Sequence, residues 1–84
     1  VTKNDLEMKP VIYPNPNDGN FSVDLGHQTE SVTVTITDIV GQLIQTKTYN
    51  NQQNLNLKLK EPAGIYLLII EVNDKREVIR LIKE

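Results

Sequence analysis

The segment Gly64–Val72 is the longest nearly unbroken apolar run in the chain, and it constrains the fold more than any other stretch. Apolar side chains fill both alternating sets of positions, whereas a strand with one solvated face would alternate apolar and polar residues. The run therefore predicts a central β-strand with both faces covered. The turn dipeptide Asn73-Asp74 follows it, and a second apolar segment with interspersed cations extends from Lys75 to Lys83.

The rest of the chain alternates between segments with a period of two, typical of half-buried strands, and polar turns. Seven strands are expected, at residues 11–13, 21–25, 32–37, 42–49, 55–59, 64–72 and 75–83. Turn sequences separate them at residues 14–19, 26–31, 38–41, 50–53 and 61–64. No helix is expected between them. The predicted fold class is all-β, an immunoglobulin-like antiparallel β-sandwich of about seven strands.

The last segment also carries a helical signal. Asp74 and Glu77 match a capping box, and the apolar residues between positions 78 and 82 fall on one helical face. However, only a two-residue turn separates this segment from the long strand at 64–72, which needs an antiparallel neighbour. A strand is therefore favoured over a helix.

Length and composition exclude several classes of protein. Eighty-four residues suffice for one small domain, and the absence of cysteine excludes disulfides and thiolate zinc sites. The net charge of −2 argues against a nucleic-acid partner, which requires a basic surface to neutralise phosphates. No apolar run approaches the roughly 20 residues that span a bilayer, so direct membrane insertion is not expected. Residues 1–8 are polar and aperiodic, as in a linker, and no export signal is found there.

Charge is distributed unevenly along the chain. Residues 1–74 contain five lysines and nine carboxylates, whereas residues 75–84 contain four cations and two carboxylates. The last segment is thus the basic end of an acidic chain. Taken alone, these cations fit an edge strand that is guarded against unwanted pairing.

The residues offer little for catalysis. The only histidine, His27, stands in a polar turn sequence, and no serine is placed for a nucleophile–base set. The aspartates lie near predicted turns, where they bond to local backbone groups, and no calcium-loop pattern occurs. We therefore expect no enzyme, no cofactor and no metal site. Phe21 and Tyr66 are expected in the core, with the Tyr66 hydroxyl placed for a corner hydrogen bond.

Three stretches together resemble a known family. They are Tyr13–Phe21 with the sequence YPNPNDGNF, Ile36–Gln42 with ITDIVGQ, and Ala63–Tyr66 with AGIY, followed by a basic apolar segment. In this order and spacing they are similar to the C-terminal sorting domains of proteins exported by the type IX secretion system of Gram-negative bacteria, type A subfamily. The resemblance covers residues 9–84.

The resemblance implies a sorting domain at residues 9–84, joined through residues 1–8 to a larger upstream cargo. Such a domain directs its cargo across the outer membrane through the type IX translocon, after transit through the periplasm, to the cell surface or medium. A sortase-like surface peptidase commonly removes it. The positions that match the family's motifs are Pro14, Asn15, Pro16, Gly19, Asp38, Gly41, Gly64, Tyr66, Arg80 and Lys83.

The residues also suggest how such a domain is recognised. If Tyr66 faces the core, the alternate residues Ile65, Leu67 and Ile69 leave a more apolar outer sheet face than a lone domain needs. This face is a candidate docking surface. We expect Arg80 and Lys83 beside it, where they would orient an acidic partner, or a partner would add a strand along the terminal edge.

The alternative from a different class is a fibronectin- or immunoglobulin-like accessory module, such as a carbohydrate-binding module, of an extracellular enzyme. A sorting signal must end its protein, whereas a spacer module can stand anywhere along it. An enzyme is the least favoured interpretation, because the residues do not predict a convergent polar cleft.

Overall fold

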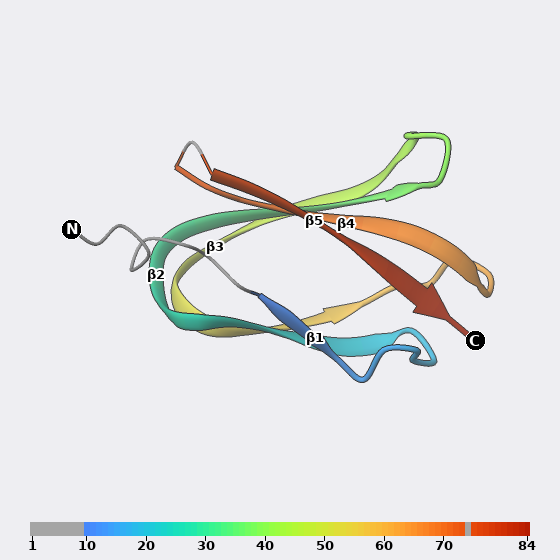
Figure 1. The fold of residues 1–84 in the computed structure, drawn as a ribbon, viewed down its shortest axis with the longest axis horizontal. Helices are drawn as coiled ribbons and strands as arrows, with labels where there is room; N and C mark the ends of the chain where they lie inside the picture. Colours follow the sequence, from blue (N-terminus) through green and yellow to red (C-terminus); the bar gives the residue numbers. More distant parts are fainter. Residues whose placement is uncertain (1–9, 74) are drawn as a thin grey trace.

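The computed structural model describes residues 10–73 and 75–84, which form five antiparallel β-strands (Figure 1). The strands are β1 (Val11–Tyr13), β2 (Asn20–Asp38), β3 (Leu43–Lys58), β4 (Gly64–Val72) and β5 (Lys75–Lys83). The expected linker at residues 1–8 lies outside the described residues. In the described part of the chain, no helix is long and apolar enough to cross a membrane.

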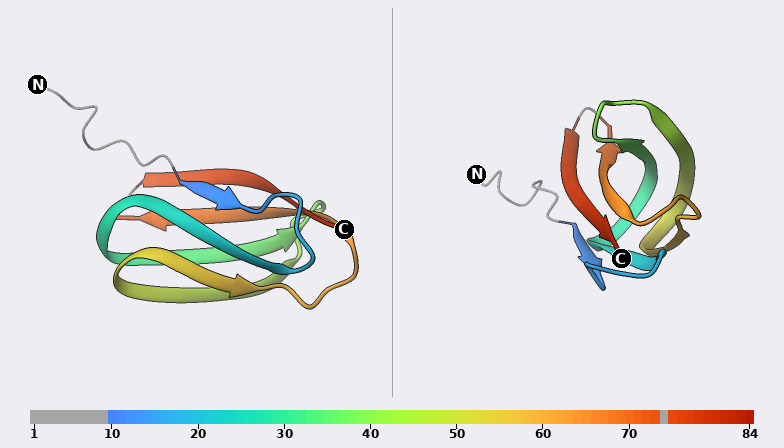
Figure 2. Two further views of the ribbon diagram at one scale, coloured as in Figure 1. Left: turned by 90° about the horizontal axis from the view of Figure 1, so that it is seen from below. Right: turned by 90° about the vertical axis from the view of Figure 1, so that its right-hand side faces the viewer.

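All five strands belong to one curled antiparallel sheet (Figure 2). β2 lies at its centre: β3 pairs along one side of it, while β1 and β4 pair with its first and second halves on the other side. Among the described strands, β5 pairs with β4 alone and forms an edge. Because β2 and β3 bend, the first half of β2 faces its second half across the core.

The all-β, antiparallel prediction is confirmed, but the seven-strand count is wrong. The segments expected at 21–25 and 32–37 join into β2, and those at 42–49 and 55–59 join into β3. The turns expected at 26–31 and 50–53 are bends in these strands rather than breaks. The two strands bend together, because Ser31 pairs with Asn50 and Thr29 pairs with Gln52 within the bend.

Backbone conformation explains why the bends do not end the strands. The register between β2 and β3 shifts between Asp24 and Thr29, and within this interval Gly26 has a φ of +90°. On the partner strand, Asn51 has a φ of +55°. Glycine and asparagine adopt such angles at little cost, so the paired ribbon turns while its hydrogen bonding resumes beyond the bend.

The core lies inside the curl and is made of the inward set of alternating residues from every strand. Its largest fully buried side chains are Leu25, Ile36, Leu55, Leu59, Leu68, Ile70 and Leu81. Phe21 and Tyr66 are buried as predicted. Each layer of the curled sheet thus buries one face against the other layer.

The expectation that both faces of the central strand are covered is only half right. In β4, the inward residues Tyr66, Leu68 and Ile70 are buried, whereas Ile65 on the other face is 46% exposed. The next outward residues, Leu67 and Ile69, are half-buried. The unbroken apolar run therefore encodes one core face and one apolar face that is open to solvent.

The last segment is the strand β5, as predicted, and it pairs with β4 from Lys75 to Lys83. The predicted tyrosine corner is also present: the Tyr66 hydroxyl donates a hydrogen bond of 2.6 Å to the carbonyl oxygen of Pro62. This contact holds the turn before β4 against the start of that strand.

We expect Tyr66→Phe to lower the free energy of unfolding by about 1 kcal/mol, because it removes this hydrogen bond while keeping the buried ring. Urea denaturation of the two proteins measures the difference. Tyr13→Phe is a matched control, since the Tyr13 hydroxyl is exposed and makes only a long contact of 3.3 Å to Asn54. Equal losses in both variants would show that the corner bond contributes nothing specific.

Candidate functional site

The candidate site residues, scattered through the sequence, gather at one end of the molecule. Gly64 pairs with Lys83 across β4 and β5, and Asp38 at the end of β2 pairs with Tyr66. The turn at residues 14–19 reaches the same place, because Asn17 bridges to Lys83. We call this the motif end; it holds the chain's final residues, and the bends of β2 and β3 lie at the opposite end (Figure 2).

Asn15 joins the first turn to the side of β5 that faces away from β4. Its side-chain amide donates to the Arg80 carbonyl oxygen at 3.0 Å, and its side-chain oxygen accepts from the Ile82 amide at 3.0 Å. One carboxamide thus provides a donor and an acceptor to two backbone groups of an edge strand. It takes the place that a further strand would occupy.

Asn17 continues this pairing with its backbone. Its amide donates to the Ile82 carbonyl at 3.0 Å, and its carbonyl accepts from the Glu84 amide at 2.8 Å. Its buried side chain orders the turn itself, accepting from the Gly19 amide at 2.9 Å and donating to the Pro14 carbonyl at 3.0 Å. We call the contacts of Asn15 and Asn17 with β5 the clasp.

Gly19 and Lys83 pack against the backbone at Leu59, on the inward side of the motif end. Gly19 has a φ of +113°, and a Cβ placed there would lie 2.7 Å from the carbonyl oxygen of Leu59. Only glycine fits this position without a shift of the backbone. The Lys83 ammonium passes close to Gly19 and donates to the carbonyl oxygens of Leu59, at 3.0 Å, and Glu61.

Asp38 and Gly41 build the hairpin between β2 and β3. The Asp38 carboxylate accepts hydrogen bonds from the amides of Val40, at 3.1 Å, and Gln42, at 2.8 Å. Gly41 has a φ of +92° and donates its amide to the Asp38 carbonyl at 3.0 Å. Both residues therefore have a clear structural role in the turn.

The remaining motif positions differ in what the structure requires of them. Pro14 and Pro16 are exposed, and each follows a cis peptide bond in the turn. Gly64 has an ordinary φ, and the atom nearest to an added Cβ would be 3.8 Å away, so its backbone does not demand glycine. Nothing in the structure explains why glycine stands there.

Arg80 and Lys83 do not both lie beside the apolar outer face, contrary to the expectation from sequence. Successive side chains of a strand point to opposite faces. Lys83 shares the inward face with the buried Leu81, whereas Arg80 is exposed on the outer face, opposite Leu67 of β4. Only Arg80 therefore lies on the predicted docking surface.

The outer side of β4 and β5 forms one apolar surface around this arginine. Its cross-strand pairs are Ile65 with Ile82, Leu67 with Arg80, and Ile69 with Val78. We call these six residues the outer face. Ile65 is 46% and Val78 52% exposed, which are high values for aliphatic side chains on a well-packed sheet.

The same side of the sheet changes character over β2 and β3. There the cross-strand pairs are threonines, with hydroxyl contacts of 3.4 Å between Thr33 and Thr48 and 3.1 Å between Thr35 and Thr46. Polar pairs of this kind are usual on a solvated sheet. On this side of the sheet, the apolar pairs of β4 and β5 therefore give way to threonine pairs between β2 and β3.

The clasp covers only part of that edge. In an antiparallel pair, alternate residues direct their amide and carbonyl groups to the same side, so Val78 and Arg76 face the edge together with Ile82. The clasp bonds to the backbone from Arg80 to Glu84. Within residues 10–73 and 75–84, the first half of β5 therefore presents an unpaired edge next to the outer face.

Asn17 is not among the residues predicted from the sequence, although this buried residue makes four hydrogen bonds at the motif end. The available signal was an asparagine between a proline and an Asp-Gly pair, which marks a turn but does not indicate what the turn touches. His27 is exposed. Among the described residues, no three or more His, Cys, Asp or Glu side chains are grouped so that they can hold a metal.

The tight fit of Gly19 gives a stability prediction. Gly19→Ala is expected to cost about 3 kcal/mol or more, because a strained backbone angle combines with the overlap against the Leu59 carbonyl. Gly26→Ala is the matched control: it has a similar positive φ, but nothing lies within 4 Å of the added Cβ, so about 1 kcal/mol is expected. Thermal and urea unfolding measure both. A Gly19 variant as stable as the Gly26 variant would contradict this packing.

A sequence model of one family, described as the secretion system C-terminal sorting domain, matches residues 11–84. The matched range contains all of the candidate site residues. No match was found among curated proteins.

Proposed function

The chain belongs to the family of secretion system C-terminal sorting domains, and from this we propose that the outer face of β4 and β5 is the surface by which the type IX secretion system recognises it. Domains of this family are sorting signals rather than catalysts, and they direct an attached cargo toward the cell surface or the medium. Membership supports this function and not the accessory-module alternative.

Several finer steps belong to the same proposal. The domain spans residues 9–84, residues 1–8 link it to the cargo, and the cargo passes through the periplasm. The outer-membrane translocon then binds the folded domain, and a sortase-like surface peptidase removes it. The ten motif residues act in two groups: Arg80 contacts the partner, and most of the others hold the surface in shape.

The apolar character of the outer face carries the proposal. Five of its six residues are aliphatic, and two of these are about half exposed. Burying aliphatic surface provides roughly 25 cal/mol per Å², so a partner that covers this face gains affinity without any change in the domain. An isolated domain gains no stability from leaving such side chains in water. Exposed apolar patches of this kind typically mark interaction sites.

Arg80 supplies a charge at the centre of this surface. It lies opposite Leu67, between the Ile65–Ile82 and Ile69–Val78 pairs. A guanidinium surrounded by aliphatic groups favours a carboxylate partner, because the pair is partly shielded from water once the surfaces meet. We infer that the partner presents an acidic residue within an apolar patch.

The open half of the β5 edge adds a second kind of contact. A strand of the partner could pair with the backbone of Arg76 and Val78 while its side chains cover the outer face. The clasp stops such pairing at Arg80, which fixes how far along β5 the added strand extends. This limit would set the register of the complex.

The principal test is a secretion assay with a fluorescent reporter fused ahead of residues 1–84 in a bacterium with a type IX system. Arg80→Glu is expected to lower reporter in the medium and at the cell surface about tenfold, the effect of losing about 1.4 kcal/mol of recognition energy. The pair Ile65→Thr and Ile69→Thr should lower export further, because it removes apolar contact area but keeps β-branched residues in the strand.

Two controls separate recognition from folding. Lys75→Glu makes the same charge change on the same strand, away from the outer face, and Val40→Thr makes the same apolar change at a residue that is 82% exposed in the hairpin. Both should leave export unchanged. Thermal unfolding of each variant domain checks that it remains folded. Normal export of a folded Arg80→Glu fusion would refute the assignment of the arginine.

A further inference from the structure

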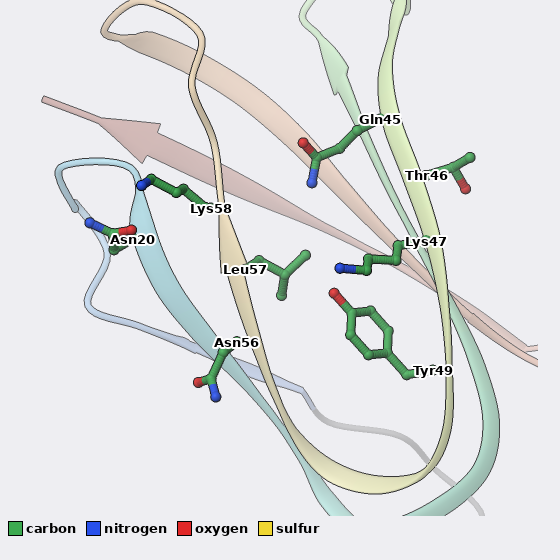
Figure 3. Close-up of a pocket in the computed structure, with 8 residues that line it drawn as sticks. All are labelled: Asn20, Gln45, Thr46, Lys47, Tyr49, Asn56, Leu57 and Lys58. Carbon is green, nitrogen blue, oxygen red and sulfur yellow. The ribbon is translucent and has the colours of Figure 1, made fainter.

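A second surface lies along β3, on the opposite side of β2 from β4 and β5. The proposed recognition through the outer face does not account for its features. The two halves of β3 form the open side of the curled sheet, and a groove of about 540 Å³ lies between them (Figure 3). Its lining comes from both halves of β3 and from the start of β2: Asn20, Gln45, Thr46, Lys47, Tyr49, Asn56, Leu57 and Lys58. We call it the β3 groove.

The first half of β3 places polar groups where core residues are expected. Gln45 pairs with Ile36, Lys47 with Val34 and Tyr49 with Val32, and all three partners are buried on the inward face. The three β3 residues therefore occupy inward positions of the sheet. In Figure 3, the side chains of Lys47 and Tyr49 extend into the space that faces Leu57 on the other half of the strand.

The groove holds an unsatisfied hydrogen-bonding group. The Tyr49 hydroxyl oxygen is buried and has no hydrogen-bond partner among the described residues. Burial raises the pKa of Tyr49 above its ordinary value, which keeps the phenol protonated and able to donate. The Lys47 ammonium lies 5.7 Å from the centre of the same ring. Leaving a buried polar group unpaired costs about 1–3 kcal/mol, so the site favours a ligand that pairs with it.

We propose that the β3 groove binds an extended acidic peptide segment, one carboxylate of which accepts hydrogen bonds from the Tyr49 hydroxyl and the Lys47 ammonium. Both groups donate, and a carboxylate oxygen only accepts, so the pairing is chemically complementary. The lining contains two lysines and no carboxylate, which gives the groove a positive charge in a chain whose net charge is −2.

The shape of the groove favours a peptide over a small anion. Each half of β3 pairs with β2 on one side only, so its other edge presents backbone amides and carbonyls toward the groove. An extended peptide satisfies such an edge through its own backbone, which a free anion or a sugar chain cannot do in register. The side-chain amide of Gln45, at an inward position opposite Ile36, provides a further polar group along the groove.

An alternative is that Lys47 only guards this edge against unwanted pairing, because inward-pointing charges serve that purpose. Protection of the edge explains the charge but not the buried hydroxyl. A phenylalanine at position 49 would guard the edge equally well and leave no unpaired oxygen. The alternative thus predicts that Tyr49→Phe has no effect on ligand binding.

The test is an NMR titration of the 84-residue chain with an acetylated heptapeptide of alternating Glu and Thr, which favours an extended backbone. Amide signals of Thr46, Lys47, Tyr49 and Leu57 are expected to shift in a saturable way. Tyr49→Phe and Lys47→Gln should each weaken binding about tenfold, the effect expected when one hydrogen bond to a charged group is lost. Lys75→Gln, which removes a cation on β5 outside the groove, should bind as the unchanged chain does.

Two further probes complete the design. The same peptide with Lys in place of Glu should not shift the groove signals. Polygalacturonate tests an acidic sugar chain, and its binding in place of the peptide would refute the peptide assignment. Absence of groove shifts with the acidic peptide, or equal affinity of the Tyr49→Phe variant, would overturn the proposal.

Discussion

The clasp between the first turn and β5 is the contact on which the rest of the structure depends. β1 ends one layer of the curled sheet and β5 ends the other. The backbone hydrogen bonds of Asn17 with Ile82 and Glu84 join the turn after β1 to the end of β5. These bonds close the curl and place the final strand. The buried Asn17 and the tightly packed Gly19 then fix the turn that makes this closure possible.

This arrangement explains how structural motif residues serve a sorting signal. Several motif residues at this end use their side chains to bond to backbone groups. They hold β5 against β4, and the outer face exists only while these two strands are paired. Arg80 is the exception, since it is exposed on that face. If the outer face is the recognition surface, as we propose, the residues that hold β4 and β5 together would matter for recognition as well as Arg80.

Much of the fold was predictable because alternation of apolar and polar residues reports directly on strands with one buried face. The number of strands was not predictable, because Gly26 and Asn51 are residues typical of turns. The pairing of Ser31 with Asn50, seen only in the structure, shows that β2 and β3 continue past them. Likewise, the sequence placed Arg80 and Lys83 in one basic segment. The two side chains lie on opposite faces because of the register in which β5 pairs with β4. The sequence of this short segment also fits a helix, so it does not determine that register.

Amide hydrogen exchange of the folded chain tests the central claim most directly. The amides of Val78 and Ile82 both point to the outer edge of β5, but among the described residues only that of Ile82 is bonded, to Asn15. The clasp predicts strong protection of the Ile82 amide, rapid exchange at Val78, and loss of the Ile82 protection in Asn15→Ala. Exchange at Ile82 as rapid as at Val78 in the unchanged chain would contradict the clasp.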